Sequence, residues 1–194
     1  TQETVHVIDR MRESIATLLG AIEPETISVG QNMTTLSFAL ARGLSRVLNK
    51  GDEVLITQLD HEANRGPWLT LRDVGVNVRE VKLLPTGVLD YEDFASKINE
   101  NTRLVCLGMS ANSIGTVNNF KLVRELTYKY NSWLLLDAVH YAPHFSIDVQ
   151  ALGCDFLLCS AYKFYGPHLG FLYSKPGLLD RVPTDRLRTA GQVA

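Results

Sequence analysis

The stretch SWLLLDAVHYAPHFSIDVQALGCDFLLCS, residues 132–160, decides the fold class. It contains two short apolar runs, SWLLLDA (132–138) and DFLLCS (155–160), and RLVCLGM (103–109) has the same character. A strand that faces water on one side alternates apolar and polar residues, whereas a strand covered on both faces needs no polar side. The three runs do not alternate. They therefore predict strands inside a sheet that has helices on both faces.

Short apolar runs and longer amphipathic stretches alternate along the rest of the chain. Strands are expected at residues 26–30, 53–57, 76–84, 103–109, 132–138, 155–160 and 170–174. Helices are expected at residues 4–20, 34–48, 62–74, 91–98 and 119–130. This order predicts an α/β fold with three αβα layers and a mostly parallel sheet, in which the last two strands can form an antiparallel pair. Because no repeat or linker interrupts the pattern, we expect one domain.

The composition is that of an ordinary globular protein. Of 194 residues, 45% are hydrophobic and 21% are charged, and the net charge is −2. These values argue against disorder and against a nucleic-acid partner, and no apolar run reaches the ~18–20 residues that a membrane helix needs. The first residues lack the features of a signal peptide. The three cysteines form no CxxC pair, so we expect a protein of the reducing cytoplasm.

Polar residues gather directly after the expected strands. In open α/β sheets, ligands bind beyond the carboxyl ends of the strands, where residues from distant parts of the chain meet. The candidates are Asn32, Met33, Thr34, His61, Asn112, Asp137, His140, Ser160, Tyr162 and Lys163. Each also has a structural interpretation: Thr34 or Asp137 as a helix cap, the histidines as hydrogen-bonded structural groups, and Lys163 as a surface lysine.

Lys163 has unusual neighbours for a surface lysine. Aromatic and turn residues surround it, namely Tyr162, Phe164, Tyr165, Gly166 and Pro167. We expect the rings to desolvate the amine, which favours its neutral, nucleophilic form. Pyridoxal phosphate needs a lysine for its Schiff base, an acid at the pyridine nitrogen, a group over the ring face and a helix N-terminus for the phosphate. The candidates supply these parts, and neither GxGxxG nor GxxxxGK[ST] is present to indicate another cofactor.

Three longer stretches carry a resemblance to a known family. They are LDHEANRGPW (59–68), SANSIGTVN (110–118) and DAVHYAPHFSIDVQALGCDFLLCSAYKFYGPHLGFLY (137–173). From about residue 27 to 173, the chain resembles the large domain of fold type I pyridoxal-phosphate enzymes, in the class V aminotransferase and cysteine desulfurase-like family. The resemblance implies pyridoxal 5'-phosphate as cofactor, a small amino acid as substrate, a homodimer, and no metal.

The resemblance also implies a role for each candidate residue. Lys163 resembles the Schiff-base lysine, which also acts as the base at the substrate Cα, and Asp137 resembles the partner of the pyridine nitrogen. His61, the second catalytic candidate, occupies the place of the imidazole that stacks on the cofactor ring. Asn112 matches the residue near the ring hydroxyl. The residues expected at the phosphate are Asn32, Met33 through its backbone N–H, Thr34, Ser160 and Tyr162.

Two positions depart from the desulfurase pattern. His140 stands where desulfurases usually carry Gln, and Tyr162 stands where they usually carry His; both look more like kynureninase. Cys106, Cys154 and Cys159 do not match the persulfide-forming cysteine of desulfurases. We therefore expect a cysteine desulfurase-like enzyme, with an aminotransferase, a kynureninase-type hydrolase or an epimerase as alternatives. A non-catalytic α/β binding module is the remote alternative.

The length of 194 residues bears on the domain organisation. Members of the family are roughly twice as long, which is more than the usual ~100–200 residues of one domain. We expect residues 1–194 to be a cofactor-binding large domain without its C-terminal small domain. The final RTAGQVA (188–194) is expected to form no closing element.

Overall fold

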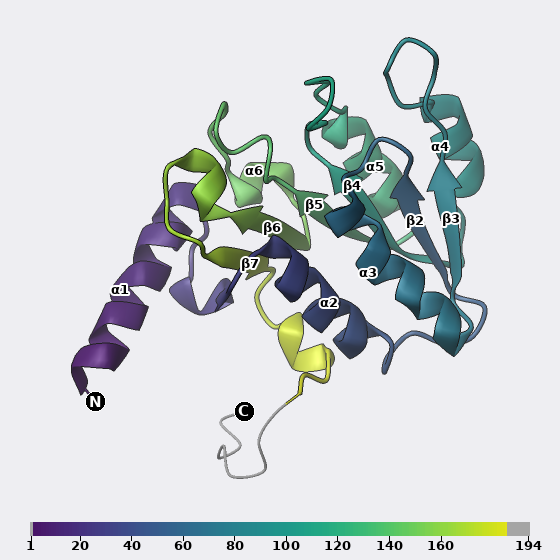
Figure 1. The fold of residues 1–194 in the computed structure, drawn as a ribbon. Coiled ribbons are helices and arrows are strands. Elements are labelled where there is room, and N and C mark those ends of the chain that lie inside the picture. The colour runs from purple at the N-terminus through teal and green to yellow at the C-terminus, as the bar shows by residue number, and fades with distance from the viewer. Residues whose placement is uncertain (1, 186–194) are drawn as a thin grey trace.

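A computed structural model describes residues 2–185 and shows a seven-stranded sheet with helices on both faces (Figure 1). The strands are β1 (Ile27–Gly30), β2 (Glu53–Thr57), β3 (Asn77–Val81), β4 (Thr102–Gly108), β5 (Trp133–Asp137), β6 (Phe156–Ser160) and β7 (Gly170–Ser174). Their order across the sheet is β1-β7-β6-β5-β4-β2-β3. The pairs from β3 to β6 are parallel, and β7 is antiparallel to both β6 and β1. The predicted fold class and the antiparallel pair are thus confirmed.

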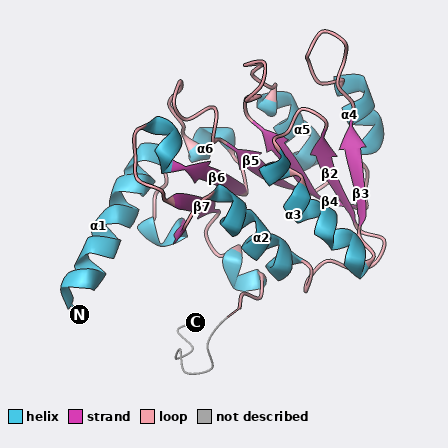
Figure 2. Cartoon of the chain, viewed as in Figure 1, coloured by secondary structure: helices cyan, strands magenta, loops and turns pink. Residues whose placement is uncertain are grey.

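Helices cover the sheet and connect its strands (Figure 2). The α-helices are α1 (Gln2–Leu19), α2 (Met33–Leu44), α3 (Gly66–Leu69), α4 (Tyr91–Lys97), α5 (Phe120–Lys129) and α6 (Val149–Leu152). Short 3₁₀ helices lie at Pro24–Thr26, Glu62–Asn64, Thr70–Val74, Ala161–Phe164 and Leu179–Arg181. Among the helices of residues 2–185, none combines the length and apolar character needed to cross a membrane. The predicted RTAGQVA terminus lies outside the described residues.

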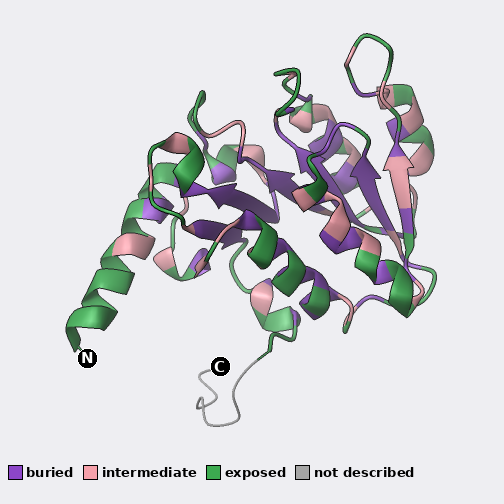
Figure 3. Cartoon of the chain, in the orientation of Figure 1, coloured by how far each residue is buried: buried purple, intermediate pink, exposed green. Residues whose placement is uncertain are grey.

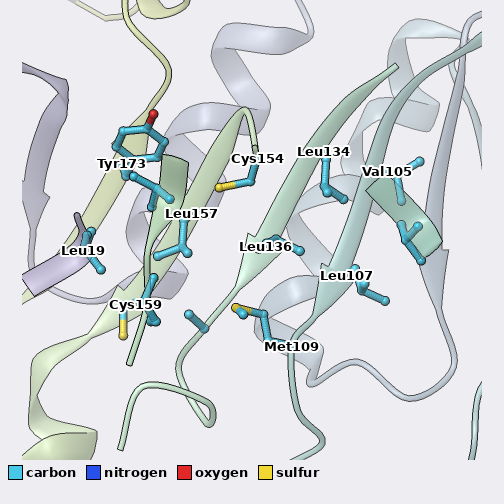
Figure 4. Close-up of a cluster of buried hydrophobic side chains, with 14 of the residues drawn as sticks. Leu19, Val105, Leu107, Met109, Leu134, Leu136, Cys154, Leu157, Cys159 and Tyr173 are labelled. Atoms are coloured by element: carbon cyan, nitrogen blue, oxygen red, sulfur yellow. The ribbon is translucent and has the colours of Figure 1, made fainter. Parts of the chain in front are cut away.

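Two hydrophobic cores lie on opposite faces of the sheet. In β5, Leu134 and Leu136 belong to the core that α1, α4, α5 and α6 cover, whereas Leu135 belongs to the core that α2 and α3 cover. This alternation follows the two-residue period of a strand. Figure 4 shows part of the first core, and Figure 3 shows that the central strands are buried. The unbroken apolar runs are therefore explained by burial on both faces.

Two segments differ from the sequence-based expectation. Residues 62–74 do not form one helix but two 3₁₀ helices and α3. Pro67 lacks an N–H and restricts the chain before it, and the non-helical φ of −123° at Arg65 marks the break. Helix α6 was not expected because it has only four residues. The side chain of Asp148 caps its N-terminus, and Gly153 ends it at a φ of 61°.

Strand β7 brings the end of β1 beside the end of β6. Gly170, the first residue of β7, pairs with Gly30 of β1 on one side and with Ser160 of β6 on the other. A Cβ atom at Gly170 would overlap the backbone of Asn32, so this close approach requires glycine. The N-terminus of α2 therefore lies next to Ser160, which is 127 residues from Met33 along the chain.

Candidate active site

A cavity of about 90 Å³ lies at the carboxyl edge of the parallel strands. Four segments of the chain line it with Met33, Thr34, His61, Ala63, Asp137, Val139, His140, Ser160, Tyr162 and Lys163. All the predicted site residues are in this set except Asn32 and Asn112. Asn112 lies exposed in the loop after β4, so its role near a cofactor hydroxyl stays a prediction. The convergence agrees with the rule that ligands bind at this edge of an α/β sheet.

Larger cavities occur elsewhere on the described part of the chain. One of about 440 Å³ lies between α5 and α6, and aromatic and aliphatic side chains such as Phe120, Tyr141 and Leu152 line it. Acids, hydroxyls and a lysine also line it, but it has no imidazole and none of the predicted site residues. Chemistry therefore locates the candidate site better than volume does.

The N-terminus of α2 forms one end of the cavity. Asn32 caps this helix. Its Oδ1 accepts a hydrogen bond of 2.9 Å from the Thr35 N–H, and the Thr35 hydroxyl accepts one of 3.3 Å from the Asn32 N–H. The Met33 N–H donates to Ser160 Oγ over 2.9 Å. The helix dipole makes such a terminus suited to an anion, although the Met33 and Thr35 N–H groups already donate within the protein. The structural interpretation of Thr34 as the helix cap is therefore wrong, because Asn32 caps α2 and Thr34 lines the cavity.

Asp137 ends β5 and is 6% exposed. Its Oδ1 accepts a hydrogen bond of 2.9 Å from the Val139 N–H, and no cation among residues 2–185 forms an ion pair with it. Burial raises the pKa of Asp137 to about 6, although the Val139 hydrogen bond acts in the opposite direction. A buried carboxylate in this state has the chemistry to bind a protonated ring nitrogen.

Two imidazoles face each other across the cavity, with their ring centroids 6.4 Å apart. His61 Nδ1 accepts a hydrogen bond of 3.0 Å from the Ala63 N–H, which fixes the first turn after β2. The pKa of His140 is lowered, first by burial and then by the positive charges of Lys163, His61 and His144. His140 is therefore a neutral hydrogen-bonding group near pH 7, since its ordinary pKa is already about 6.5.

Lys163 lies in the 3₁₀ helix Ala161–Phe164, which follows β6. The expectation that aromatic neighbours desolvate its amine is wrong, because the residue is exposed. Phe164 turns inward and packs on Phe171, while Tyr165 is fully exposed at a φ of 67°. Of the three flanking rings, Tyr162 lies close, with its centroid 5.5 Å from Lys163 Nζ. Neighbours in a tight turn point in different directions, which the sequence pattern does not reveal.

His168 is a site neighbour that sequence reasoning missed. Its ring stacks on Tyr162 with the centroids 4.7 Å apart and an interplanar angle of 20°. The stacking holds the Tyr162 ring beside Lys163, although both rings belong to an exposed loop. The sequence contains no signal for this pairing, because five residues separate two side chains in an irregular turn.

The family is evident from a comparison with known proteins. A family model, "Aminotransferase class-V", matches residues 1–192. The chain belongs to the class-V aminotransferase family. Curated relatives include the cysteine desulfurase of Yersinia pseudotuberculosis serotype O:1b (strain IP 31758), which is 35% identical over 184 residues. That match covers 93% of the chain and 45% of the relative, so the chain spans about half the length of the curated relatives it matches.

Solved structures of the family share the fold. The cysteine desulfurase CsdA from Escherichia coli superposes with a TM-score of 0.86 at 28% identity, covering 93% of this chain and 46% of that one. The apo cysteine desulfurase from Thermococcus onnurineus NA1 gives a TM-score of 0.87 at 26% identity, with the same coverage. The mostly parallel sheet of residues 2–185 is thus the fold type I architecture of these enzymes.

Enzymes of this family depend on pyridoxal phosphate, and the residues of the cavity fit that cofactor. The cavity offers a buried acid, Asp137, that lacks a cation among the described residues. It also offers a primary amine on Lys163, and a helix N-terminus with the Ser160 hydroxyl beside it. A ring nitrogen, an aldehyde and a phosphate require these three groups.

Proposed function

We propose that this chain carries the cofactor site of a cysteine desulfurase-like enzyme, which acts on an amino acid through a Schiff base between Lys163 and pyridoxal phosphate. The observation that carries the proposal is the single cavity that Lys163, Asp137 and His61 line together. These residues come from three separate strand ends, and no shared structural need explains why all three should meet.

Different residues of the cavity would bind different parts of the cofactor. Asp137 keeps a proton on the ring nitrogen, which a buried carboxylate does better than an exposed one. His61, which follows β2 and lines the cavity, would pack on the ring. The start of α2 would hold the phosphate, where Thr34, Ser160 and Tyr162 supply hydroxyl donors; the Met33 N–H, which now donates to Ser160 Oγ, would have to exchange that partner for the phosphate.

Lys163 has a second task in this proposal, the movement of a proton at the substrate Cα. When bound, the cofactor supplies an electron sink for the bond that breaks there. The exposed position of Lys163 at the mouth of the cavity allows its amine to reach both the cofactor and an incoming amino acid. Neutral His140 can accept a hydrogen bond without adding positive charge beside the amine.

Sulfur transfer within residues 2–185 would need an exposed thiolate. Cys106, Cys154 and Cys159 are free but buried, and burial raises the pKa of Cys154 and of Cys159 to about 12. These thiols are therefore core residues and not nucleophiles. Transamination, kynureninase-type hydrolysis and epimerisation stay alternative reactions, and His140 and Tyr162 in the cavity favour the hydrolysis among them.

We also propose the setting in which the site works. Residues 1–194 form the cofactor-binding large domain of an enzyme that acts as a homodimer in the cytoplasm, on a small amino acid, without nucleic-acid or membrane partners. The share of each relative that the chain covers supports the domain assignment. The three free cysteines support a reducing compartment.

The decisive test uses the protein made from its complete gene. Purified with pyridoxal phosphate, it should show visible absorbance from the bound cofactor, and Lys163→Ala should lose that band. Lys175→Ala, an exposed lysine after β7 and outside the cavity, is the matched control and should keep the band. Retention of the band by Lys163→Ala would show that another amine anchors the cofactor.

A substrate panel then separates the reactions. Alanine released from cysteine, together with sulfide when a thiol reductant is added, indicates desulfuration. A keto acid indicates transamination, and alanine released from a kynurenine-type substrate indicates hydrolysis. Loss of optical activity without net product indicates epimerisation. If the complete protein binds no cofactor and changes no amino acid, the binding-module alternative replaces the enzyme proposal.

A further inference from the structure

Asp60, directly before His61, is a buried carboxylate to which the roles above assign nothing. It is 8% exposed and follows β2 by three residues. Its Oδ2 accepts a hydrogen bond of 3.0 Å from the Thr57 N–H in its own strand, and its Oδ1 accepts one of 2.5 Å from the Gly108 N–H. Because Gly108 ends β4, the Asp60 side chain ties the carboxyl ends of two neighbouring strands together.

Gly108 connects Asp60 to the opposite wall of the cavity. It lies directly across from Asp137 in the β4–β5 ladder, and the next residue, Met109, donates its N–H to the Asp137 carbonyl over 2.8 Å. A Cβ atom at Gly108 would lie 2.8 Å from Asp60 Oδ1, so this carboxylate occupies the space where a side chain would stand. Two hydrogen bonds therefore connect Asp60 to Asp137: one from the Gly108 N–H to Asp60, and one from the Met109 N–H to the Asp137 carbonyl.

The position of the His61 ring depends on the two hydrogen bonds that Asp60 accepts. The ring is exposed, and the hydrogen bond that holds it comes from Ala63, two residues further along the same loop. The ring consequently moves with the loop, and the loop is fastened to the sheet through Asp60. A ligand site requires its groups within about 0.5 Å of their working positions, which a loose loop does not provide.

We propose that Asp60 is a positioning residue of the cofactor site, which fixes His61 at a set distance from Asp137 by clamping the end of β2 to the end of β4. This inference rests on the proposed function, in which His61 and Asp137 contact opposite parts of pyridoxal phosphate. Asp60 is also coupled electrostatically to this part of the sheet: the charge of Asp137 raises the pKa of Asp60, and the charge of Asp60 raises the pKa of the Cys106 thiol.

The test compares two buried aspartates at opposite ends of the same strand. Asp60→Asn keeps the size of the side chain but replaces one acceptor by an NH₂ group that faces an N–H donor. Asp52→Asn is the matched control: Asp52 is also buried, accepts the Asn49 N–H over 2.7 Å, and lies just before β2, at the edge far from the cavity. Both variants are made in the protein from the complete gene.

Two readouts distinguish positioning from a purely structural role. Only Asp60→Asn should weaken the binding of pyridoxal phosphate, by about tenfold, which is typical for the loss of an outer partner of a ligand group, whereas Asp52→Asn should leave that binding unchanged. Above about pH 7, where Asp60 carries its charge, the pH midpoint of the visible band should shift to lower values in Asp60→Asn, because a negative charge near the protonated cofactor is removed.

Each outcome is decisive. If the wild-type protein does not bind the cofactor, the proposed function fails; if it binds and Asp60→Asn behaves like Asp52→Asn in affinity and pH midpoint, the positioning role alone is wrong. Should Asp60→Asn not fold, Gly108→Ala displaces the same carboxylate and is expected to weaken cofactor binding equally. If neither variant folds, Asp60 serves the fold and not the site.

Discussion

Buried carboxylates lie at both edges of the sheet, but only those at the amino edge form ion pairs within residues 2–185. At the amino edge, Asp52 and Asp155 directly precede β2 and β6, and an arginine neutralises each of them. Arg124 Nη1 lies 2.9 Å from Asp155 in a pair that is about nine-tenths buried. Arg103 Nε lies 3.0 Å from Asp52, nearer the surface.

At the carboxyl edge, Asp60 and Asp137 are equally buried, yet no described cation forms an ion pair with either. Burial raises their pKa values to about 7 and about 6, and the hydrogen bonds from backbone N–H groups only partly oppose this. An unpaired buried charge destabilises the fold, and Asp137, which lines the cavity, is available to a cationic group of a ligand. The ion pairs that stabilise the fold therefore lie at the amino edge, and the unpaired carboxylate that lines the ligand cavity lies at the carboxyl edge.

The largest expected effect concerns the paired edge. Arg124→Met should lower the free energy of unfolding by about 3–5 kcal/mol, because Asp155 is left buried without its cation. Urea unfolding measures the change. The double variant Arg124→Met/Asp155→Asn is the control and should recover part of the loss. A change below about 1 kcal/mol would mean that this pair behaves like an exposed one.

The unpaired edge should respond in the opposite direction. Asp137→Asn should raise the stability of the apo-protein by up to about 3 kcal/mol near neutral pH while it weakens cofactor binding. The native pKa is about 6 and the ordinary value is 3.8, so the native state holds its proton more tightly. Stability contributed by this group is full at low pH and falls as the pH rises from about 4 to about 6.

The pH dependence of the Asp137→Asn effect provides the control for this prediction. The stability difference between Asp137→Asn and wild type should vanish below about pH 4, where both the native and the unfolded wild-type protein carry the proton. Chemical denaturation at a series of pH values measures it. A difference that stays constant with pH would show that packing and not charge causes the effect.

Gly170→Ala examines how the carboxyl edge is assembled. The added methyl group meets the Asn32 backbone, so α2 must move away from β6, at a cost of about 1–3 kcal/mol. Affinity for pyridoxal phosphate should fall as well, because the α2 N-terminus and Ser160 separate. Gly66→Ala is the control, since its Cβ would meet only the Glu62 side chain, at 3.4 Å. Equal losses in both variants would contradict the role of Gly170.

The smallest effect is expected at the exposed pair of the amino edge. Arg103→Met should change the free energy of unfolding by less than about 1 kcal/mol, because the Arg103 side chain is 43% exposed. The Asn49 N–H continues to donate to Asp52 after the change. Thermal unfolding of Arg103→Met beside Arg124→Met measures how much of the contrast between the edges depends on depth of burial.

The sequence predicts the parts of this molecule that local patterns control. The unbroken run at Leu134–Leu136 predicts a strand covered on both faces, and the polar residues after each run predict which side chains share the cavity. Asp60 and Gly108 escape prediction because 48 residues separate the two ends of their hydrogen bond. The exposure of Lys163 escapes it as well, since a 3₁₀ turn sends neighbouring rings in different directions.

The insertion of β7 between β1 and β6 also sets the order in which the protein can be assembled during synthesis. Strands β2, β4, β5 and β6 can pair as they leave the ribosome, whereas β1 pairs only with a strand that is translated about 140 residues later. Until β7 is made, the edge of β1 has no partner strand, and the start of α2 lacks its close contact with Gly170. The anion-binding end of the cavity is thus a late product of folding, and a nascent chain that stops before Gly170 lacks it.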